Sequence, residues 1–467
     1  MWMGFCVAML FFVGVGIFSA TRAKQDVKDY LVAGRSVSPV AAGLSAVASN
    51  NSGFMFIGAI GFTYAYGLAA IWLFFAWIAG DYVSWRIVHA KLRRFSEERE
   101  ANSIAGFLAH NGNETERFLQ LILGTLTIVF LSLYAAAQLK AGGKALQTTL
   151  DWSPTTGIVI GAVMVVIYSF AGGIRASIWT DVAQSIVMLA AMTLLVAICH
   201  LQVVQLSDLA ASLQAIDPAL LMWTPPDATL GLVPYALGWF VAGLGGIGQP
   251  HIIVRAMTLD HEKNITQMRR TYFVWYVGFS IVTFIVGLYA RIHFESQNLA
   301  ATFDAETALP LLAMSHLPQW LVGLILAALF AATLSTADSQ VLACSASITQ
   351  DLARELRENY LASKIATVSV VIFSFIIAWV GPDSVFVLVT IAWGLMMTSF
   401  APLMLARVQN WRISPRRYVA AMSAGLACMF LWSFVFAQGA AVYEGTIGFT
   451  VTFIGVLLLR DSGHRDA

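Results

Sequence analysis

The chain has 467 residues, of which 58% are hydrophobic and only 11% are charged, and its formal net charge is +1. Soluble proteins carry about 25% charged residues, so this composition excludes an ordinary soluble protein and indicates one that lies in a lipid bilayer. The almost neutral net charge gives no indication of a nucleic-acid partner.

A helix needs about 20 apolar residues to cross a hydrocarbon core of about 30 Å. Applied along the chain, this length predicts about thirteen membrane-spanning helices and leaves no room for a soluble domain between them. In chain order they are expected at 2–20, 39–67, 68–89, 117–147, 155–172, 175–200, 229–254, 267–293, 319–350, 362–381, 384–406, 416–437 and 441–459. The sequence therefore predicts an all-α integral membrane protein.

Lysine and arginine are unevenly distributed between the connections. The connections 201–228 and 294–318 contain no Lys or Arg but several acidic residues. Basic residues instead follow the odd-numbered spans, in five groups: Arg22, Lys24, Lys28 and Arg35; Lys91, Arg93, Arg94 and Arg99; Arg255, Lys263, Arg269 and Arg270; Arg354, Arg357 and Lys364; Arg407, Arg412, Arg416 and Arg417. Because basic connections stay in the cytoplasm, we predict that the N-terminus lies outside and the C-terminus in the cytoplasm.

Two of the predicted spans are poorly suited to a continuous helix. The span 39–67 contains "AVASNNSGFMFIG", with two asparagines, two serines and a glycine at its middle. The span 229–254 contains "VAGLGGIGQPHIIV", in which four glycines precede Gln249 and Pro250. Glycine and proline cost about 1 and about 3 kcal/mol in a helix interior, so both spans are predicted to open within the membrane. Alternatively, the glycines of the later span only let helices pack closely.

These two breaks predict a repeated architecture. Interrupted helices at corresponding positions of two half-sequences often mark a transporter's binding site. The breaks lie five spans apart, and five is odd, so the second copy of a repeat would enter the membrane from the opposite side. The second to sixth spans and the seventh to eleventh spans are therefore candidates for an inverted repeat.

The span 319–350 carries hydroxyl groups and a carboxylate in "LSTADSQ". Sodium is a hard cation that binds oxygen ligands, and an opened helix frees backbone carbonyls to supply some of them. We expect a sodium site made of such carbonyls and two hydroxyls, contributed by Ala48, Asn51, Ala332, Ser335 and Thr336. Alternatively, the hydroxyls only bond back to carbonyls of their own helix.

Four segments carry a family resemblance: "YLVAGRSVSPVAAGLSAVASNNSG", "FAGGIRASIWTDVAQ", "GIGQPHIIVRAM" and "LAALFAATLSTADSQVLACSASITQDL". They resemble the sodium/solute symporter family, and within it the sodium/proline symporters. The resemblance implies a LeuT-type core of five plus five helices, with one helix before it and two after it. It divides the chain into a first helix and loop (1–38), two repeats (39–200 and 201–406) and two last helices (407–467). It also implies sodium binding at the five residues named above.

The resemblance further implies sodium-driven import of a small organic solute, an amino acid such as proline, across a bacterial inner membrane. The solute is expected beside the breaks, against Asn50, Ser52, Gly53, Phe54, Tyr134, Gly246 and Gln249. Free backbone amides at the start of the half-helix after Gly53 are expected to hold the carboxylate of an amino acid.

Three positions depart from the proline pattern. Asn50 replaces an aspartate that is tied to cation binding, although asparagine is common there in the family's sugar carriers. Ala242 and Gly246 replace a tryptophan and a tyrosine that serve ligand binding and gating, so a larger solute could fit.

Two charged residues have two interpretations each. Asp181 falls where the family keeps an aspartate on the path of sodium to the cytoplasm, but it could also be an interfacial charge near Arg175. Lys140 is expected to reach the outer interface of the membrane, or else to face an acidic ligand.

Other functions stay open from the sequence. A proton-coupled or uncoupled carrier is one, because of Asn50 and Lys140, and a symporter-like sensor acting with a separate partner protein is another. An enzyme is not expected, since no nucleophile–base pair, metal cluster or cofactor motif stands out. Sodium is expected as the coupling ion rather than as a tightly bound cofactor, and the bilayer and the solute as the partners.

Overall fold

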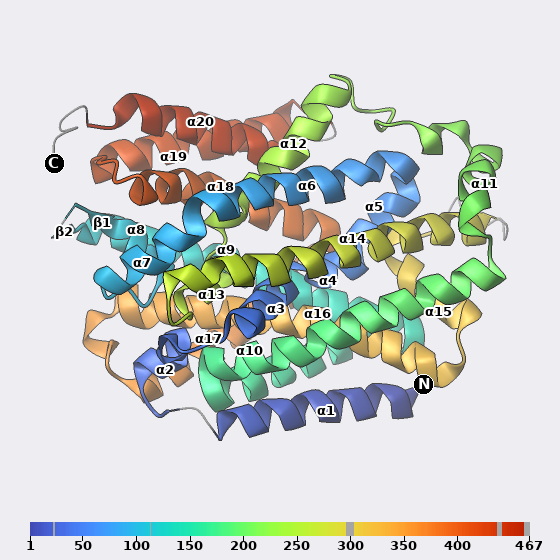
Figure 1. Cartoon of the computed structure of the whole chain (residues 1–467), viewed down its shortest axis with the longest axis horizontal. Coiled ribbons are helices and arrows are strands. Elements are labelled where there is room, and N and C mark those ends of the chain that lie inside the picture. Colours follow the sequence, from blue (N-terminus) through green and yellow to red (C-terminus); the bar gives the residue numbers. More distant parts are fainter. Residues whose placement is uncertain (22–23, 113, 296–302, 437–440, 462–467) are drawn as a thin grey trace.

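The structure, a computed structural model, describes residues 1–21, 24–112, 114–295, 303–436 and 441–461. Its long helices lie side by side along the longest axis of the molecule, with α1 along one side of the bundle and α20 on the other (Figure 1). A short hairpin pairs β1 (His110–Asn111) antiparallel with β2 (Glu114–Thr115). The predicted all-α class is confirmed.

The α-helices are α1 (Trp2–Ala20), α2 (Val27–Val32), α3 (Pro39–Asn50), α4 (Gly53–Phe56), α5 (Gly58–Tyr66), α6 (Ile71–Ser84), α7 (Ala90–Glu98), α8 (Ile104–Ala109), α9 (Arg117–Leu150), α10 (Pro154–Gln202), α11 (Leu209–Ile216), α12 (Leu232–Leu244), α13 (Pro250–Met257), α14 (Ile265–Glu295), α15 (Ala308–His316), α16 (Gln319–Ala346), α17 (Tyr360–Val380), α18 (Val385–Val408), α19 (Pro415–Phe430) and α20 (Glu444–Leu459). Shorter 3-10 turns are η1 (Ala33–Arg35), η2 (Gly67–Ala70), η4 (Leu206–Asp208), η5 (Pro218–Leu221), η6 (Gly245–Gly248), η7 (Glu262–Asn264), η8 (Ala305–Thr307) and η10 (Arg354–Leu356). Three π-helical turns continue α-helices: η3 (Trp85–His89), η9 (Ser347–Leu352) and η11 (Leu431–Val435).

Within the described ranges, nine helical stretches are long and apolar enough to cross a membrane, and the bent pair Leu232–Gly248 and Pro250–Met257 makes a tenth. Pro154–Ile167 and Glu444–Leu459 are shorter apolar helices. Every predicted span contains a helix, but the second is in pieces, and its later part joins the third into one stretch, Gly53–Glu98. The lower count therefore reflects how the helices are interrupted and joined.

The first predicted break is present between α3 and α4. The chain leaves the helical conformation at Asn51, whose φ and ψ are −91° and 71°. The Ser52 side chain then accepts a hydrogen bond from the Phe54 amide at 3.2 Å and so caps α4, which is four residues long. Serine and asparagine suit this position because their side chains can satisfy backbone groups that an interrupted helix leaves free.

The second predicted break lies between α12 and α13. The chain passes through the glycine-rich turn η6 and bends by 55° before α13. Pro250 is the first residue of α13, where its missing amide costs no helical hydrogen bond. Close packing contributes as well, since a Cβ at Gly243 would lie 1.9 Å from the Trp77 carbonyl oxygen. The glycines therefore both open the helix and let it approach α6.

A tight turn at Gly172 and Gly173 divides α10 into the two spans that the sequence predicts there. Gly173 has φ 56° and ψ −147°, a conformation that a residue with a Cβ rarely adopts. A Cβ at this position would also lie 2.5 Å from the backbone oxygen of Tyr30 in α2. The turn thus ties α10 to the connection after α1.

The basic connections gather at one end of the bundle, near α2, α7, α8 and the hairpin, and the acidic connections with α11 and α15 lie at the opposite end (Figure 1). We call the former the basic end. Some of its charges are not loop residues, which corrects the sequence interpretation. Arg255 lies on α13 and is fully buried, and Arg93 and Arg407 donate to the carbonyl oxygens of Leu259 and Leu108 at 2.6 and 2.9 Å. That the basic end faces the cytoplasm stays a prediction.

Replacing Gly173 by alanine is expected to lower the free energy of unfolding by about 1–3 kcal/mol or more, because of the unusual backbone conformation and the overlap with Tyr30. Thermal unfolding of the purified protein in detergent measures the effect. Gly278→Ala is the matched control, since a Cβ there meets nothing within 4 Å and alanine favours the helix interior by about 1 kcal/mol. Equal melting temperatures for the two variants would contradict this account.

Candidate functional site

The break after α3 meets the hydroxyl-bearing turn of α16. The Ser335 hydroxyl lies 3.2 Å from the Ala48 carbonyl oxygen and 3.1 Å from that of Ala332. The Thr336 hydroxyl donates to the Ser49 carbonyl oxygen at 3.0 Å. The structure therefore brings most of the predicted sodium ligands together, and the alternative in which both hydroxyls bond only within their own helix is wrong.

Asn51 takes a different position from the other four predicted ligands. Its side-chain nitrogen donates to the Val47 carbonyl oxygen at 2.9 Å, so the side chain turns back along α3. Its side-chain oxygen is buried and has no hydrogen-bond partner among the described residues. Around Ser335, the donor set is two carbonyls and hydroxyls without a formal charge, a set of hard oxygens that fits a sodium ion.

A buried charged network lies beside this oxygen cluster. The side chains of Asp181 and Arg255 are both 0% exposed and form an ion pair with an N–O distance of 3.4 Å. Ser45 donates to the same Asp181 oxygen at 2.6 Å. On α16, Asp338 accepts a hydrogen bond from Ser177 at 2.7 Å. Ion pairing and hydrogen bonds together make the burial of these charges tolerable.

The network and the oxygen cluster share residues. Ser339 donates to the Ser335 carbonyl oxygen at 2.6 Å, and its hydroxyl lies 2.9 Å from that of Ser49. Arg255 also hydrogen-bonds to Ser339. A change in charge or position at Asp181 can thus reach Ser335 through a few short contacts.

The contacts distinguish between the two interpretations of Asp181. Arg175 binds Asp29 instead, with 3.0 Å between Nε and Oδ2, so the interpretation of Asp181 as an interfacial charge near Arg175 is wrong. The actual partner, Arg255, was not predicted, because its place in the sequence groups it with the basic loops. Its position one turn after His251, and so within the short helix that follows the break, was the available signal.

Tyr134 lies at the first break, as predicted. Its ring is 1% exposed, packs edge-on against His251 with centroids 5.5 Å apart, and its hydroxyl is within hydrogen-bonding reach of Ser52. Gln138, one turn further along α9, was missed: its side-chain oxygen accepts the Gly53 amide at 2.9 Å. With the Phe54 amide bound to Ser52, the first two amides of α4 are already occupied, which corrects the expectation that they are free for a carboxylate.

At the second break, Gln249 donates to the Trp393 carbonyl oxygen at 3.2 Å. Gly246 faces a carboxylate that sequence analysis also missed, since a Cβ at Gly246 would lie 2.9 Å from Oδ1 of Asp81. Asp81 is buried on α6 and accepts a hydrogen bond from Tyr272 at 2.7 Å. An acid in a predicted membrane span was the signal that could have identified it.

Several buried polar atoms near the breaks have no hydrogen-bond partner in the part of the chain that the structure describes. They are Asn51 Oδ1, Gln138 Nε2, Gln249 Oε1 and both ring nitrogens of His251. Native proteins leave few such atoms unsatisfied, and each one calls for an explanation. At the two breaks, these atoms are available to hydrogen-bond to a polar ligand or to water.

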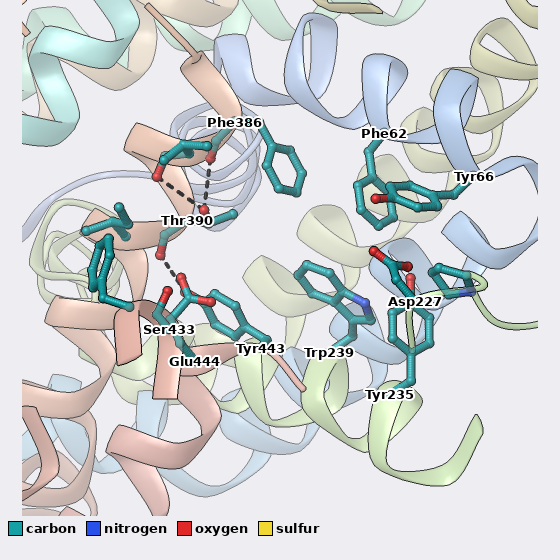
Figure 2. Close-up of a pocket in the computed structure, with 14 residues that line it drawn as sticks. Phe62, Tyr66, Asp227, Tyr235, Trp239, Phe386, Thr390, Ser433, Tyr443 and Glu444 are labelled. Carbon is teal, nitrogen blue, oxygen red and sulfur yellow. Dashed lines mark hydrogen bonds between the residues drawn. The ribbon is translucent and has the colours of Figure 1, made fainter. Parts of the chain in front are cut away.

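A cavity of about 280 Å³ opens between α5, α12, α18 and α20; we call it the vestibule (Figure 2). Its aromatic lining residues are Phe62, Tyr66, Tyr235, Trp239, Phe386, Phe434 and Tyr443. Phe386 also packs against Phe54 with ring centroids 5.4 Å apart, and Trp239 stacks on Trp77 at 6.0 Å. A layer of aromatic rings therefore lies between the vestibule and the first break.

A second, more polar cavity of about 620 Å³ lies at the basic end and shares no lining residue with the vestibule. Arg35 lines it and donates to the carbonyl oxygens of Ala101 and Met257 at 2.9 and 3.0 Å. Burial lowers the pKa of Arg35 to about 10, at which it is still charged near neutral pH. The breaks thus have a separate cavity toward each end of the bundle.

Lys140 has a partner within the protein. Its ammonium group lies 2.9 Å from the Asp383 carboxylate, which is fully exposed shortly before α18 begins. The hydrogen bond from Lys140 lowers the pKa of Asp383. This contact agrees with the expectation that Lys140 reaches toward the interface.

Comparisons with known proteins agree with this geometry. The model of the Sodium:solute symporter family matches residues 30–425. The high-affinity proline transporter of Bacillus subtilis (strain 168) is 28% identical over 95% of this chain and 94% of its own length. The sodium/proline symporter of Escherichia coli (strain K12) is 28% identical over 97% of this chain and 91% of its own.

Two solved structures share the fold. A substrate-bound, outward-open Na+-coupled sialic acid symporter superposes with a TM-score of 0.79 at 20% identity, covering 97% of this chain and 96% of that one. Mhp1, a nucleobase-cation-symport-1 family transporter in a closed conformation, superposes with a TM-score of 0.58 at 14% identity, covering 92% and 94%. The predicted LeuT-type core is thereby confirmed.

The Asp181–Arg255 pair generates a prediction about stability. Replacing Arg255 by methionine should lower the free energy of unfolding by about 3–5 kcal/mol, because it leaves a buried carboxylate without its cation. The double variant with Asp181→Asn should recover part of this loss, since no uncompensated charge then remains. Thermal unfolding of both single variants and the double variant gives the coupling energy, and purely additive effects would show that the pair does not interact.

Proposed function

Because the chain belongs to the Sodium:solute symporter family, we propose that it uses sodium to import one small organic solute, an amino acid or a close relative of one. Membership in this family makes the chain a sodium-coupled membrane transporter and not an enzyme. The identity of the solute and of the residues that bind it is proposed here. Two relatives that are named as proline transporters, each 28% identical to this chain, support an amino acid as the solute.

One observation supports the proposed sodium site. An opened helix and a hydroxyl-bearing helix meet so that Ser335 reaches the carbonyl oxygens of both Ala48 and Ala332. We infer that sodium binds among these oxygens and Thr336, with Asn51 able to add its unpartnered side-chain oxygen. Sodium would replace the hydrogen bonds that now join α3 to α16.

The solute is proposed to bind between the two breaks. The side chains that leave unpartnered atoms there, among them Gln249 and Gln138, can donate to and accept from a polar solute. Ser52, Gly53 and Phe54 on one break, Gly246 on the other, and Asn50 and Tyr134 beside them complete the proposed contacts. Tyr134 and Asn50 reach Ser52 and Tyr276 respectively, so both are held in place by neighbours.

Coupling follows from the shared helix. The same break that would supply sodium ligands at Ala48 begins the proposed solute site at Ser52. Sodium that holds α3 against α16 therefore favours the arrangement to which the solute binds, a coupling typically worth about 1–3 kcal/mol. Asp181 is joined to Ser335 by three successive contacts, through Arg255 and Ser339, and is proposed to lie on the path by which sodium leaves toward the basic end.

Three further assignments belong to the proposal. The two repeats are placed at 39–200 and 201–406, between the first helix and loop (1–38) and the last two helices (407–467). The protein is placed in a bacterial inner membrane, with the N-terminus outside and the basic end in the cytoplasm. Transport driven by protons is the second candidate, favoured by Asn50 and by the buried carboxylate of Asp81.

The double variant Ser335→Ala, Thr336→Ala is expected to lose sodium-stimulated uptake, because both hydroxyls of the proposed site are removed. Uptake of radiolabelled L-proline into proteoliposomes, with a sodium gradient or with a proton gradient in sodium-free buffer, measures this. Ser369→Ala is the matched control, since its hydroxyl is exposed and bonds only to the Ile365 carbonyl oxygen. Unchanged sodium stimulation in the double variant would refute the site, and equal uptake with protons alone would favour the second candidate.

The solute can be identified without assuming proline. Amino acids, sugars and carboxylates are added to the purified protein with sodium and with potassium, and the melting temperature is measured. A solute at about 100 times its Kd should stabilise the protein by about 2.7 kcal/mol. The proposal expects stabilisation by a solute only when sodium is present; stabilisation that is the same in potassium would count against sodium coupling.

A further inference from the structure

Glu444 contributes an acidic group to the vestibule that the proposed mechanism does not use. Its side chain is 9% exposed, yet it lines the cavity. Among the described residues its carboxylate has no ion pair and no hydrogen bond to another residue. Asp227 supplies a second, more exposed carboxylate, and none of the lining residues is Lys, Arg or His. The vestibule therefore has two acidic side chains and no basic residue among those that line it.

The rings around these carboxylates resemble a site for a positive charge. Trp239 and Tyr443 are stacked with centroids 5.5 Å apart and an angle of 10°, and Figure 2 shows both rings between Glu444 and Asp227. Tyr235 packs edge-on against Trp239 at 6.4 Å. Aromatic faces attract ammonium groups, with tryptophan the best of them, and aromatic cages recognise quaternary ammonium ligands.

The helix α20 is fixed so that Glu444 and Tyr443 stay in the cavity wall. The Tyr443 hydroxyl donates to the Thr390 carbonyl oxygen on α18 at 2.6 Å. Thr446 donates to the Gly238 carbonyl oxygen on α12 at 2.8 Å. These contacts join a helix outside the two repeats to both walls of the vestibule, so the acid is held in place rather than left at a free helix end.

A third carboxylate, that of Asp81, lies below the floor of the vestibule. Trp77 stacks on Trp239, and Asp81 follows Trp77 by one turn of α6, which is about 6 Å of rise. Asp81 accepts from Tyr272 and lies against Gly246 at the second break. None of the ion pairs in the part of the chain that the structure describes includes Asp81. A buried acid without a basic partner marks a functional position in a membrane protein.

We propose that the transported solute has a net positive charge, carried by an ammonium or guanidinium group that no carboxylate of the solute balances. This group binds first between Glu444 and the Trp239 and Tyr443 rings and then at Asp81. This inference rests on the proposed function and specifies its solute class. The two carboxylates lie along one route, from the vestibule through the Trp77 layer to the second break. A cation on this route would contact first the aromatic rings and then Asp81, a carboxylate that forms no ion pair with a described residue of the protein.

A purely structural role for Glu444 makes a different prediction. It is the first residue of α20, where an acidic side chain stabilises the positive end of the helix dipole. Removal of that interaction would lower the melting temperature of the protein. It would leave unchanged the ratio of affinities for a cationic compound and its neutral isostere, which is therefore the quantity to measure.

The test compares choline with 3,3-dimethyl-1-butanol, and L-arginine with L-citrulline, on the full-length protein in sodium buffer. Quenching of tryptophan fluorescence, with Trp239 in the cavity wall, gives the Kd of each compound. At least one cation should bind about tenfold or more tightly than its neutral isostere in the wild type. The ratio should fall severalfold in Glu444→Gln and in Asp81→Asn. Asp208→Asn, an exposed acid at the same end, should keep the wild-type ratio.

The proposal is overturned if neither cation binds, if cations and neutral isosteres bind equally, or if the ratio is unchanged in Glu444→Gln and Asp81→Asn. If Glu444→Gln does not fold, Asp81→Asn and Asp227→Asn decide in the same way. Sodium-driven uptake that is confined to solutes without a net positive charge would overturn this inference and leave the proposed symport intact. Loss of all sodium dependence would instead count against the proposed function itself.

Discussion

The contact between the interrupted α3 and the hydroxyl groups of α16 is the constraint on which the rest of the site depends. A helix that opens within a membrane must find partners for its free backbone groups inside the protein. Ser335 and Thr336 provide them at Ala48 and Ser49. This arrangement requires α16 to lie at the centre of the bundle, where 89% of its membrane-spanning window is buried. The same contact gathers the carbonyl and hydroxyl oxygens among which we propose that sodium binds.

Buried charged side chains are arranged differently on the two sides of the contact between α3 and α16. Toward the basic end, Arg255 forms an ion pair with Asp181 and donates to Ser177, whose hydroxyl donates in turn to Asp338. Toward the vestibule, Asp81 and Glu444 have no basic partner in the described part of the chain. Since an uncompensated buried charge is costly, the two arrangements indicate different roles. The paired network supports the helices around the oxygen cluster, whereas the unpaired acids are suited to a positive charge that arrives from solution.

The cavities at the two ends suggest how access can alternate. The aromatic layer of Phe54, Phe386 and Trp77 separates the vestibule from the breaks. At the basic end, Arg35 holds neighbouring connections together through their carbonyl groups. The two cavities share no lining residue. A solute at the proposed binding region can therefore reach either end of the bundle only after the aromatic layer or the contacts of Arg35 rearrange. Movement of one repeat against the other around a central site is the usual means in folds of this type.

Hydropathy and the placement of Gly, Pro, Ser and Asn were sufficient to predict the helices, both breaks and the helix α16 that meets the first of them. These features are local. They follow from the number of apolar residues that a membrane span needs and from the free-energy cost of Gly or Pro at a given helix position. The surroundings of Arg255, Gln138, Asp81 and Glu444 could not be predicted from the sequence, because helices distant along the chain form them. Whether a buried charge is paired depends on which helices face each other, and that is decided only when the bundle packs. The sequence by itself therefore determined where the chain must open, and the tertiary structure alone decided which charges meet there and which stay without a partner.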